Sequence, residues 1–175
     1  MRSPVLQLRV ETLAGTHAVA AALAGVVRAG DVILLAGEMG VGKTAFAQGF
    51  GRALGVVEPI TSPTFTLVHS YDTTGPTLHH ADLYRLEHLA EVADLALIEL
   101  AESDGVVLVE WGDVAESTFG EHVVVRLGLV DGAPEARMVT FEPVGSSWAP
   151  RWARLADAVD AAGEADDSGS TVPAC

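Results

Sequence analysis

The sequence predicts an α/β domain in which helices are layered on a mixed parallel and antiparallel central sheet. Two short apolar runs, residues 31–36 and 106–109, have the composition of buried parallel strands. Turn signals at 72–76 and at 131–132 separate further strand-like segments and indicate hairpins. A chain of 175 residues fits one domain built from both kinds of unit.

The amino-terminal third predicts strands and helices in alternation. The expected order is strand 5–10, helix 16–28, strand 31–36 and helix 44–54. The first strand is expected to be half-buried because apolar and polar residues alternate along it. Thr16 is the expected N-cap of the first helix, and Gly30 and Gly55 follow the two helices as stop signals.

The rest of the chain predicts two hairpins, a helical segment, a buried strand and a final helix. The expected elements are a hairpin of strands 64–71 and 77–83, one helix or two short helices over 87–102, strand 106–109, a hairpin of strands 122–130 and 136–142, and helix 148–162. The predicted domain therefore covers residues 1–162. The small, acidic residues 163–175 are expected to form a disordered tail.

The loop between the second strand and the second helix carries the strongest functional signal. It has the pattern G-x-x-x-x-G-K-T of the phosphate-binding loop (P-loop) of nucleoside triphosphatases, formed by Gly37, Glu38, Met39, Gly40, Val41, Gly42, Lys43 and Thr44. The glycines let the backbone curl around phosphate with its N–H groups pointing inward. Lys43 is the only lysine in the chain and is expected at the β- and γ-phosphates, with the Thr44 hydroxyl at Mg²⁺.

The net charge of −14 limits the classes of partner. Nine arginines and one lysine are scattered without a basic stripe, so strong direct binding to nucleic acid or to an anionic membrane is not expected. A role in a nucleic-acid process would then act through other proteins, although the acidity equally fits a purely solubilising role. No apolar run approaches the roughly 20 residues of a membrane span, and no secretory signal is present, so a cytoplasmic location is expected.

Asp82 lies near the end of the predicted strand 77–83, in the run His80-Ala81-Asp82-Leu83-Tyr84-Arg85. A carboxylate at a strand end can bind Mg²⁺ directly or through water, as the acidic partner of Thr44. The alternative is a surface loop aspartate paired with Arg85. The adjacent His79 and His80 suggest a metal site only weakly, because no further ligands at matching spacing accompany them.

Glu110 and Trp111 come directly after the apolar strand 106–109. Ligands of open α/β sheets bind beyond the carboxyl ends of the strands, so Glu110 can complete a Mg²⁺ shell or orient a hydrolytic water. Trp111 beside it can shield the site or stack on a partner. The alternative is a capping glutamate and a core tryptophan.

Two further features are candidates for contacts with the nucleotide. The hydroxyl-rich segment 61–66 follows the P-loop helix, where switch segments that respond to the γ-phosphate lie in such enzymes. Arg137 lies on the last predicted hairpin, and its charge can reach the nucleotide or stay exposed as an ordinary strand arginine.

The motifs GEMGVGKT, SPTFTLVHSY, LHHADLYRL and VLVEWGD together resemble those of the bacterial TsaE (YjeE) ATPases, in the same order and over about residues 5 to 160. This resemblance implies a Mg²⁺- and ATP-dependent subunit of the threonylcarbamoyl modification of tRNA adenosine beside the anticodon, acting with TsaD and TsaB. It also implies roles for particular residues.

The resemblance places the nucleotide at Gly37 to Thr44, Mg²⁺ at Thr44 and Glu110, and the Walker B-like acid at Asp82. It implies that residues 62–66 form a switch-like loop and that Trp111 is a functionally important neighbour of Glu110. It also implies that Arg137 lies near the nucleotide and that a residue within 12–16, represented by Thr12, contacts the adenine. One departure is that residues 93–96 carry alanine where the family commonly has glycine, so a different local turn is expected.

The expected reaction is hydrolysis of the ATP γ-phosphate, with Lys43 and the loop amides neutralising charge and Asp82 and Glu110 arranging metal and water. Because no arginine is positioned as a finger, slow turnover is expected without partners. A non-catalytic nucleotide-sensing switch subunit is the main alternative. A small-molecule kinase would bring a lid with several arginines, and a GTPase would need a second lysine in N-K-x-D.

Overall fold

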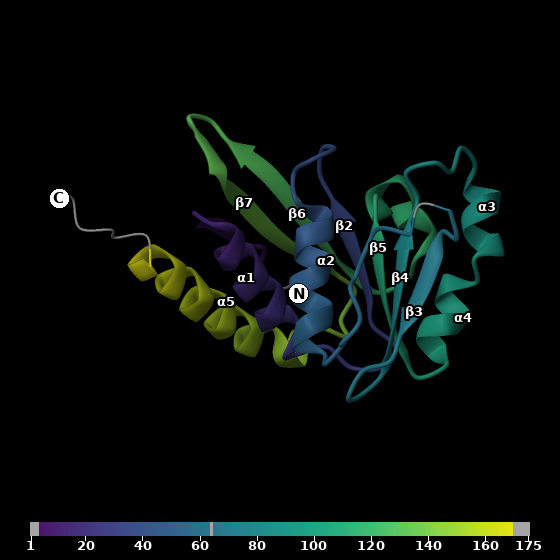
Figure 1. Ribbon diagram of the computed structural model, residues 1–175. Coiled ribbons are helices and arrows are strands. Elements are labelled where there is room, and N and C mark those ends of the chain that lie inside the picture. The colour runs from purple at the N-terminus through teal and green to yellow at the C-terminus, as the bar shows by residue number, and fades with distance from the viewer. Residues whose placement is uncertain (1–3, 64, 170–175) are drawn as a thin grey trace.

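Seven strands form one mixed sheet in the computed structural model, which describes residues 4–63 and 65–169 (Figure 1). The strands are β1 (Leu6–Val10), β2 (Val32–Ala36), β3 (Val68–Tyr71), β4 (Thr77–Asp82), β5 (Gly105–Glu110), β6 (His122–Val130) and β7 (Ala133–Val144). Their order across the sheet is β1-β7-β6-β2-β5-β4-β3. The inner strands β4, β5, β2 and β6 are parallel, whereas β1–β7, β6–β7 and β3–β4 pair antiparallel. The predicted α/β class with a mixed sheet is confirmed.

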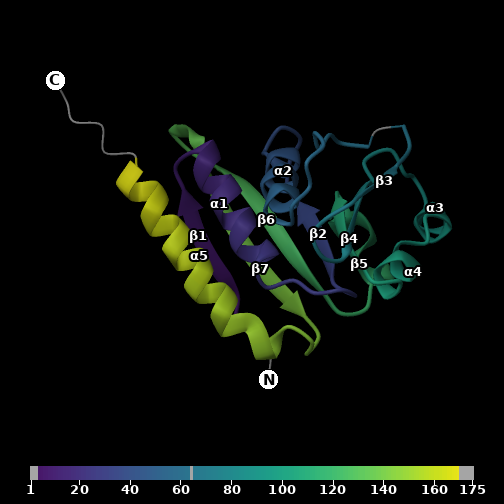
Figure 2. The ribbon, with the colours of Figure 1, turned by 60° about the horizontal axis from the view of Figure 1, so that its bottom comes forward.

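Helices cover both faces of this sheet (Figures 1 and 2). One face packs against α1 (Leu13–Ala24), α2 (Lys43–Ala53) and α5 (Ala149–Gly169), and the other against α3 (Leu89–Asp94), α4 (Leu97–Glu102) and the 3₁₀ helix η1 (Gly112–Thr118). On β2, Ile33 and Leu35 pack toward α1 and α2, while Leu34 packs toward the other layer. A strand buried on both sides is apolar throughout, which explains the run that predicted it.

The first helix begins earlier and ends earlier than its sequence signals predict. The N-cap is Thr12, not Thr16: its extended backbone places Oγ1 to accept a hydrogen bond of 2.9 Å from the Gly15 amide. The helix stops at Ala24 instead of about Arg28. A turn replaces its expected last residues, because the Asp31 carboxylate accepts a hydrogen bond of 2.8 Å from the Arg28 amide.

The strand expected over 64–71 is shorter than predicted. Thr64 lies outside the described residues, and β3 begins only at Val68. Leu67 has a φ of 62°, which no strand residue adopts, and its amide donates to the Pro63 carbonyl at 3.0 Å. Residues 65 and 66 therefore lie in a turn, and the hairpin of β3 and β4 starts after it. Of the two alternatives expected over 87–102, one helix or two short helices, the structure has the second, as α3 and α4.

Helix α5 runs beyond the predicted end of the domain. The expectation of disorder after residue 162 is wrong for residues 163–169, which form the last turns of this helix. Asp166 stabilises these turns because its carboxylate accepts hydrogen bonds from the Glu11 amide and from the Thr12 hydroxyl. Residues 170–175 lie outside the described part of the chain. Among the described helices, none combines the length and the hydropathy that crossing a membrane requires.

Candidate functional site

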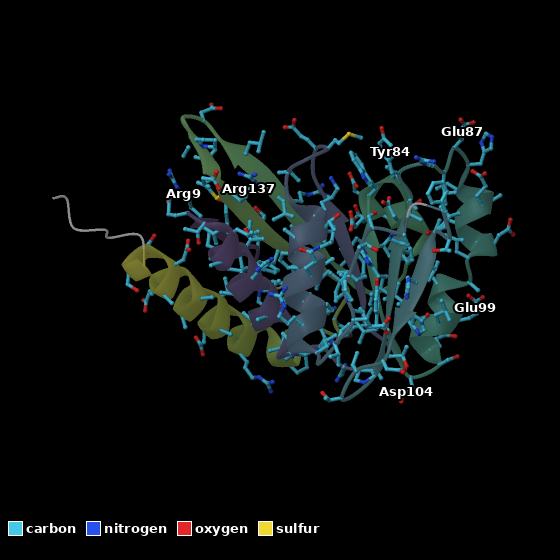
Figure 3. All side chains as sticks on the ribbon, viewed as in Figure 1. Arg9, Tyr84, Glu87, Glu99, Asp104 and Arg137 are labelled. Carbon is cyan, nitrogen blue, oxygen red and sulfur yellow. The ribbon has the colours of Figure 1, made fainter. Side chains whose placement is uncertain are left out.

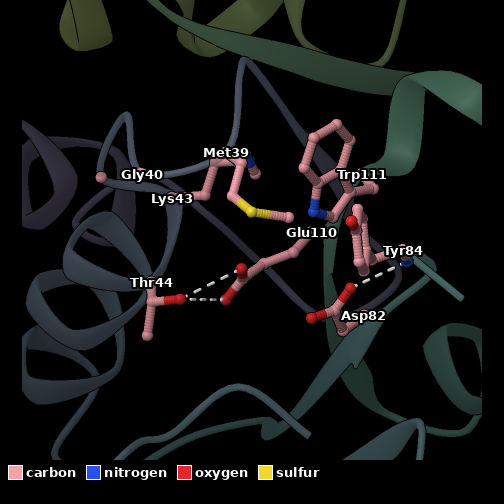
Figure 4. Close-up of a pocket in the computed structure, with 9 residues that line it drawn as sticks. Met39, Gly40, Lys43, Thr44, Asp82, Tyr84, Glu110 and Trp111 are labelled. Carbon is pink, nitrogen blue, oxygen red and sulfur yellow. Dashed lines mark hydrogen bonds between the residues drawn. The ribbon is translucent and has the colours of Figure 1, made fainter. Parts of the chain in front are cut away.

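A pocket of about 300 Å³ opens where the carboxyl ends of β2, β4 and β5 meet the amino-terminal end of α2 (Figure 4). Its lining comes from three stretches of the chain that are distant in sequence: Met39, Gly40, Gly42, Lys43, Thr44, Asp82, Tyr84, Glu110 and Trp111. This is the edge at which open α/β sheets bind ligands. The structure therefore brings the predicted loop lysine, hydroxyl, carboxylates and tryptophan to one place.

The loop backbone adopts the conformations that its glycines allow. Gly37, Gly40 and Gly42 have φ values of 144°, 79° and 112°. At Gly37 a side chain is also excluded by space, because an added Cβ would lie 2.5 Å from the Leu127 carbonyl oxygen. The loop thus curls tightly against β6 before α2 begins at Lys43.

Lys43 is buried, with 5% of its surface exposed. Its Nζ donates to the Gly37 and Glu38 carbonyl oxygens at 2.6 and 2.7 Å. The same atom lies 3.9 Å from the centre of the Trp111 ring, within cation–π distance. Burial lowers the pKa of Lys43 below its ordinary value, while the carboxylates of Glu110, Asp113 and Asp82 oppose that shift. The ammonium group is therefore hydrogen-bonded to the backbone of its own loop. Phosphate oxygens of a bound nucleotide can take the place of these carbonyl oxygens.

Glu110 lies at the end of β5 with 3% of its surface exposed. The Thr44 hydroxyl is 3.1 Å from each of its two carboxylate oxygens. His80 Nε2 lies 2.9 Å from Oε1, and toward an ionised carboxylate, the form that binds a cation, the imidazole acts as the donor. The predicted proximity of Thr44 and Glu110 is present in the structure, together with a histidine that lies deeper in the sheet.

Asp82 lies beside Glu110, because β4 and β5 are paired in parallel with these two residues as partners. Its Oδ2 accepts from the Ser62 hydroxyl, and its Oδ1 accepts from the Tyr84 amide at 2.9 Å. Ser62, which follows α2 in the chain, is thus bonded directly to the second carboxylate of the pocket. The side chain of Asp82 is not paired with Arg85, whose guanidinium lies instead 5.8 Å from the Phe65 ring.

Trp111 and Tyr84 form an aromatic wall on one side of the pocket. Their ring centres are 5.2 Å apart, and the Trp111 backbone has a φ of 59°. Met39 at 67% exposure and Tyr84 at 53% stand at the rim (Figure 4). The pattern had indicated Trp111 and Met39 but not Tyr84. The turn after β4 brings this side chain back over the pocket.

The two adjacent histidines serve different faces of the sheet. His79 Nδ1 lies 2.7 Å from the Ser70 hydroxyl on β3, whereas His80 points to the opposite face and contacts Glu110. Within residues 4–63 and 65–169, no cluster of three or more His, Cys, Asp or Glu side chains is suited to hold a metal ion. The sequence did not predict the contact of His80 with Glu110. The available signal was that His80 lies two residues before Asp82 on one strand, so that both side chains point to the same face.

Arg137 and Thr12 lie outside this pocket. Arg137 Nε donates at 2.6 Å to the Val41 carbonyl of the loop, on the β7 side opposite Tyr84 (Figure 3). Thr12 lines a separate pocket of about 370 Å³ between α1 and α5, where its hydroxyl is bonded to Asp166. Arg137 is the register partner of Val10, two residues before Thr12.

The pocket at the P-loop, called the main pocket below, has oxygen ligands and donors that fit a magnesium nucleotide. Mg²⁺ is held in such sites by one or two carboxylates and a hydroxyl, with substrate phosphates and water supplying the rest of its shell. Thr44, Glu110 and Asp82 provide these oxygens on one side of the pocket. On the other side, the loop amides and the start of α2 provide an anion site.

Comparison with characterised protein families agrees with this arrangement. The family model for the threonylcarbamoyl adenosine biosynthesis protein TsaE matches residues 10–138. That range contains all of the residues that line the main pocket.

Individual relatives extend the match. The chain is 42% identical over 133 residues to the tRNA threonylcarbamoyladenosine biosynthesis protein TsaE of Streptomyces coelicolor, covering 73% of this chain and 89% of the relative. It is 36% identical over 137 residues to TsaE of Bacillus subtilis, covering 76% and 82%. The crystal structure of YdiB from Bacillus subtilis matches with a TM-score of 0.71 and 28% identity, covering 92% of this chain and 97% of that one. The chain therefore belongs to the TsaE family of threonylcarbamoyl adenosine biosynthesis proteins.

Proposed function

We propose that this protein binds ATP with Mg²⁺ in the main pocket and hydrolyses it in support of tRNA threonylcarbamoyladenosine biosynthesis. The observation that carries this proposal is the convergence of Lys43, Thr44, Asp82 and Glu110 around one pocket beside a P-loop. Family membership supplies the biological process, and the pocket supplies the chemistry.

The loop binds the phosphate groups in this proposal. Lys43 exchanges the carbonyl oxygens of Gly37 and Glu38 for β- and γ-phosphate oxygens and stays positively charged beside the carboxylates. The loop amides and the first turn of α2 donate to the remaining phosphate oxygens. Donors fixed in this way stabilise the negative charge that develops on the transferred group. The base and ribose extend toward Arg137 and Thr12.

The carboxylates hold and orient the remaining reactants. Thr44, Glu110 and Asp82 would hold Mg²⁺, which supplies charge neutralisation at the β- and γ-phosphates when bound. Asp82 is bonded to Ser62, so the position of Ser62 depends on the same carboxylate. Trp111, which lies against Lys43, excludes water from the lysine side of the pocket.

Partner proteins complete the activity. Among the described residues, no arginine lines the pocket, and an arginine supplied by another protein commonly accelerates P-loop hydrolysis by several orders of magnitude. We therefore propose slow hydrolysis by the chain alone and acceleration by TsaD and TsaB. The aromatic and methionine rim formed by Tyr84 and Met39 is exposed at the mouth of the pocket, where a partner would approach.

The test measures ATP hydrolysis by the protein alone and with TsaD and TsaB, for the native chain and for Lys43→Met. The matched control is Arg52→Met, which removes an exposed cation from the far end of the same helix. Activity is expected to be low alone, raised by the partners, lost in Lys43→Met and retained in Arg52→Met. Full activity in Lys43→Met would refute the assignment of the site. Fast hydrolysis without partners would refute the stimulation.

A nucleotide-sensing switch without required hydrolysis is the second candidate. The bond between Asp82 and Ser62 favours it, because that bond couples the pocket to a surface turn. It predicts that Glu110→Ala retains ATP-dependent binding to TsaD and TsaB and supports tRNA modification. Loss of modification with retained binding would favour hydrolysis instead.

A further inference from the structure

His80 is a buried histidine for which packing alone gives no reason. It has 0% exposure and lies on β4 between Leu78 and Asp82, on the strand face that packs against α2. Leu78, two residues earlier, fills the equivalent place with an apolar side chain. His80 Nδ1 has no hydrogen-bond partner among the described residues, so the imidazole is buried with one nitrogen unsatisfied. Such a group in a native fold calls for an explanation beyond packing.

The register of the sheet places His80 directly behind Glu110. His80 pairs with Leu108 and Asp82 pairs with Glu110, so the imidazole lies one diagonal step below the carboxylate on the same face. Within the described part of the chain, the single polar contact of the imidazole is its bond of 2.9 Å to Glu110 Oε1. His80, Glu110 and Thr44 therefore form a row that leads from the interior of the sheet to the pocket.

The two donors to Glu110 differ in what they determine. The Thr44 hydroxyl is 3.1 Å from both oxygens and so does not distinguish between them. His80 contacts Oε1 alone. This asymmetric bond fixes the rotation of the carboxylate and engages one lone pair of Oε1, which leaves Oε2 as the oxygen with the greater capacity to bind a cation.

We propose that His80 is a positioning residue, which orients the Glu110 carboxylate so that Oε2 presents itself to the cation of a bound nucleotide. This inference rests on the proposed function of Glu110 as a Mg²⁺ ligand and adds a residue to it. Groups that hydrogen-bond a metal ligand set its orientation, and their loss commonly weakens metal binding by about 10- to 100-fold. His80 does not touch nucleotide or metal, and its effect passes through Glu110.

The experiment measures binding of a non-hydrolysable ATP analogue by calorimetry, once with EDTA and once with Mg²⁺. The dissociation constant in EDTA divided by that in Mg²⁺, called here the Mg²⁺ ratio, separates the contribution of the cation to binding from that of the loop. His80→Leu is expected to leave binding in EDTA within about twofold and to reduce the Mg²⁺ ratio by about 10- to 100-fold. Glu110→Gln is expected to reduce the ratio as well, and the double variant should show no further loss.

Two amide substitutions separate positioning from burial. Glutamine places an N–H group near the site of the imidazole Nε2, whereas asparagine is shorter and does not reach Glu110. His80→Gln is expected to keep most of the Mg²⁺ ratio and His80→Asn to lose it, although both bury an amide. This pair also decides the question if His80→Leu fails to fold.

The possible failures are distinguishable. A native chain whose binding does not respond to Mg²⁺, or a Glu110→Gln variant with an unchanged ratio, would overturn the proposed metal site itself. A reduced ratio in Glu110→Gln with an unchanged ratio in His80→Leu or His80→Asn would overturn only the role of His80. Equal losses in His80→Gln and His80→Asn would assign the histidine to packing.

Discussion

Replacing Arg151 with methionine is expected to lower the free energy of unfolding more than the same replacement at Arg154, the other arginine of α5. The guanidinium donates to both carboxylate oxygens of Asp31 at 2.5 and 2.6 Å, and to the Val26 carbonyl at 2.9 Å. It also lies 3.9 Å from the centre of the Trp148 ring. Methionine keeps much of the apolar stem but provides none of these hydrogen bonds.

The magnitude follows from burial. The side chains of Arg151 and Asp31 are 11% and 6% exposed, so the pair is largely withdrawn from solvent. Removing one member leaves an unpaired carboxylate in the interior, which costs about 3–5 kcal/mol of the free energy of unfolding. For a chain of this length, each kcal/mol lowers the melting temperature by about 2–4 °C, so a decrease of about 6–20 °C is expected.

The assay is urea denaturation followed by circular dichroism, together with thermal melting. Arg154→Met is the matched control, because Arg154 lies on the same helix with an exposed side chain that donates to the Gly25 carbonyl, and its loss is expected to cost about 1 kcal/mol or less. The double variant Asp31→Asn/Arg151→Met is expected to lose less than the sum of the single variants, because no unpaired charge remains. A loss below about 1 kcal/mol in Arg151→Met, or strictly additive losses, would refute this reasoning.

Three further changes test other parts of the structure. Burial lowers the pKa of His79 below its ordinary value of 6.5, so the unfolded chain takes up the proton first as the pH falls. The free energy of unfolding should therefore fall as the pH drops below 6.5. In urea titrations at several pH values, His79→Gln should flatten that pH dependence, and an unchanged pH dependence would contradict the assignment. Ala96 has a φ of 51°, so Ala96→Gly should raise stability by about 1 kcal/mol in the same assay, whereas Ala93→Gly within α3 should lower it. Gly37→Ala would place a Cβ 2.5 Å from a backbone carbonyl oxygen of β6 and should abolish binding of a fluorescent ADP. The control Gly120→Ala, with no atom within 4 Å of its added Cβ, should bind the ADP normally. Tight binding by Gly37→Ala would show that the loop tolerates a shift.

The α/β fold was largely predictable because its signals are local. The apolar run that forms β2 and the glycine pattern that follows it both act over a few residues, and the structure keeps them where the pattern places them. The hairpin at Gly132 forms for the same reason, since the glycine adopts a φ of 73°. A different local turn was expected over residues 93–96, where alanine replaces glycine, and within that segment Ala96 adopts the left-handed conformation that glycine favours.

The boundaries that were wrong depend on contacts between distant segments. Thr12 and Thr16 have equal capping chemistry, and the approach of α5 to Thr12 through Asp166 accompanies the start of α1 at Leu13. The last turns of α5 are acidic and rich in small residues, which favours disorder in isolation. They are helical because they pack on α1, and the Trp152 indole anchors the start of the helix by donating to the Pro4 carbonyl at 2.7 Å.

By itself, the sequence determined the chemical types at the site: a lysine and a hydroxyl after a glycine loop, and carboxylates where two strands end. Only the tertiary structure decided which of them touch. The parallel register of β4 and β5 sets Asp82 beside Glu110 and His80 behind it, and α2 then brings Thr44 to the same carboxylate. Register is a property of strands paired across the sheet, and a shift by one residue would turn these side chains to the opposite face. No local pattern in β4 alone carries that information, because its partner strand lies more than twenty residues further along the chain.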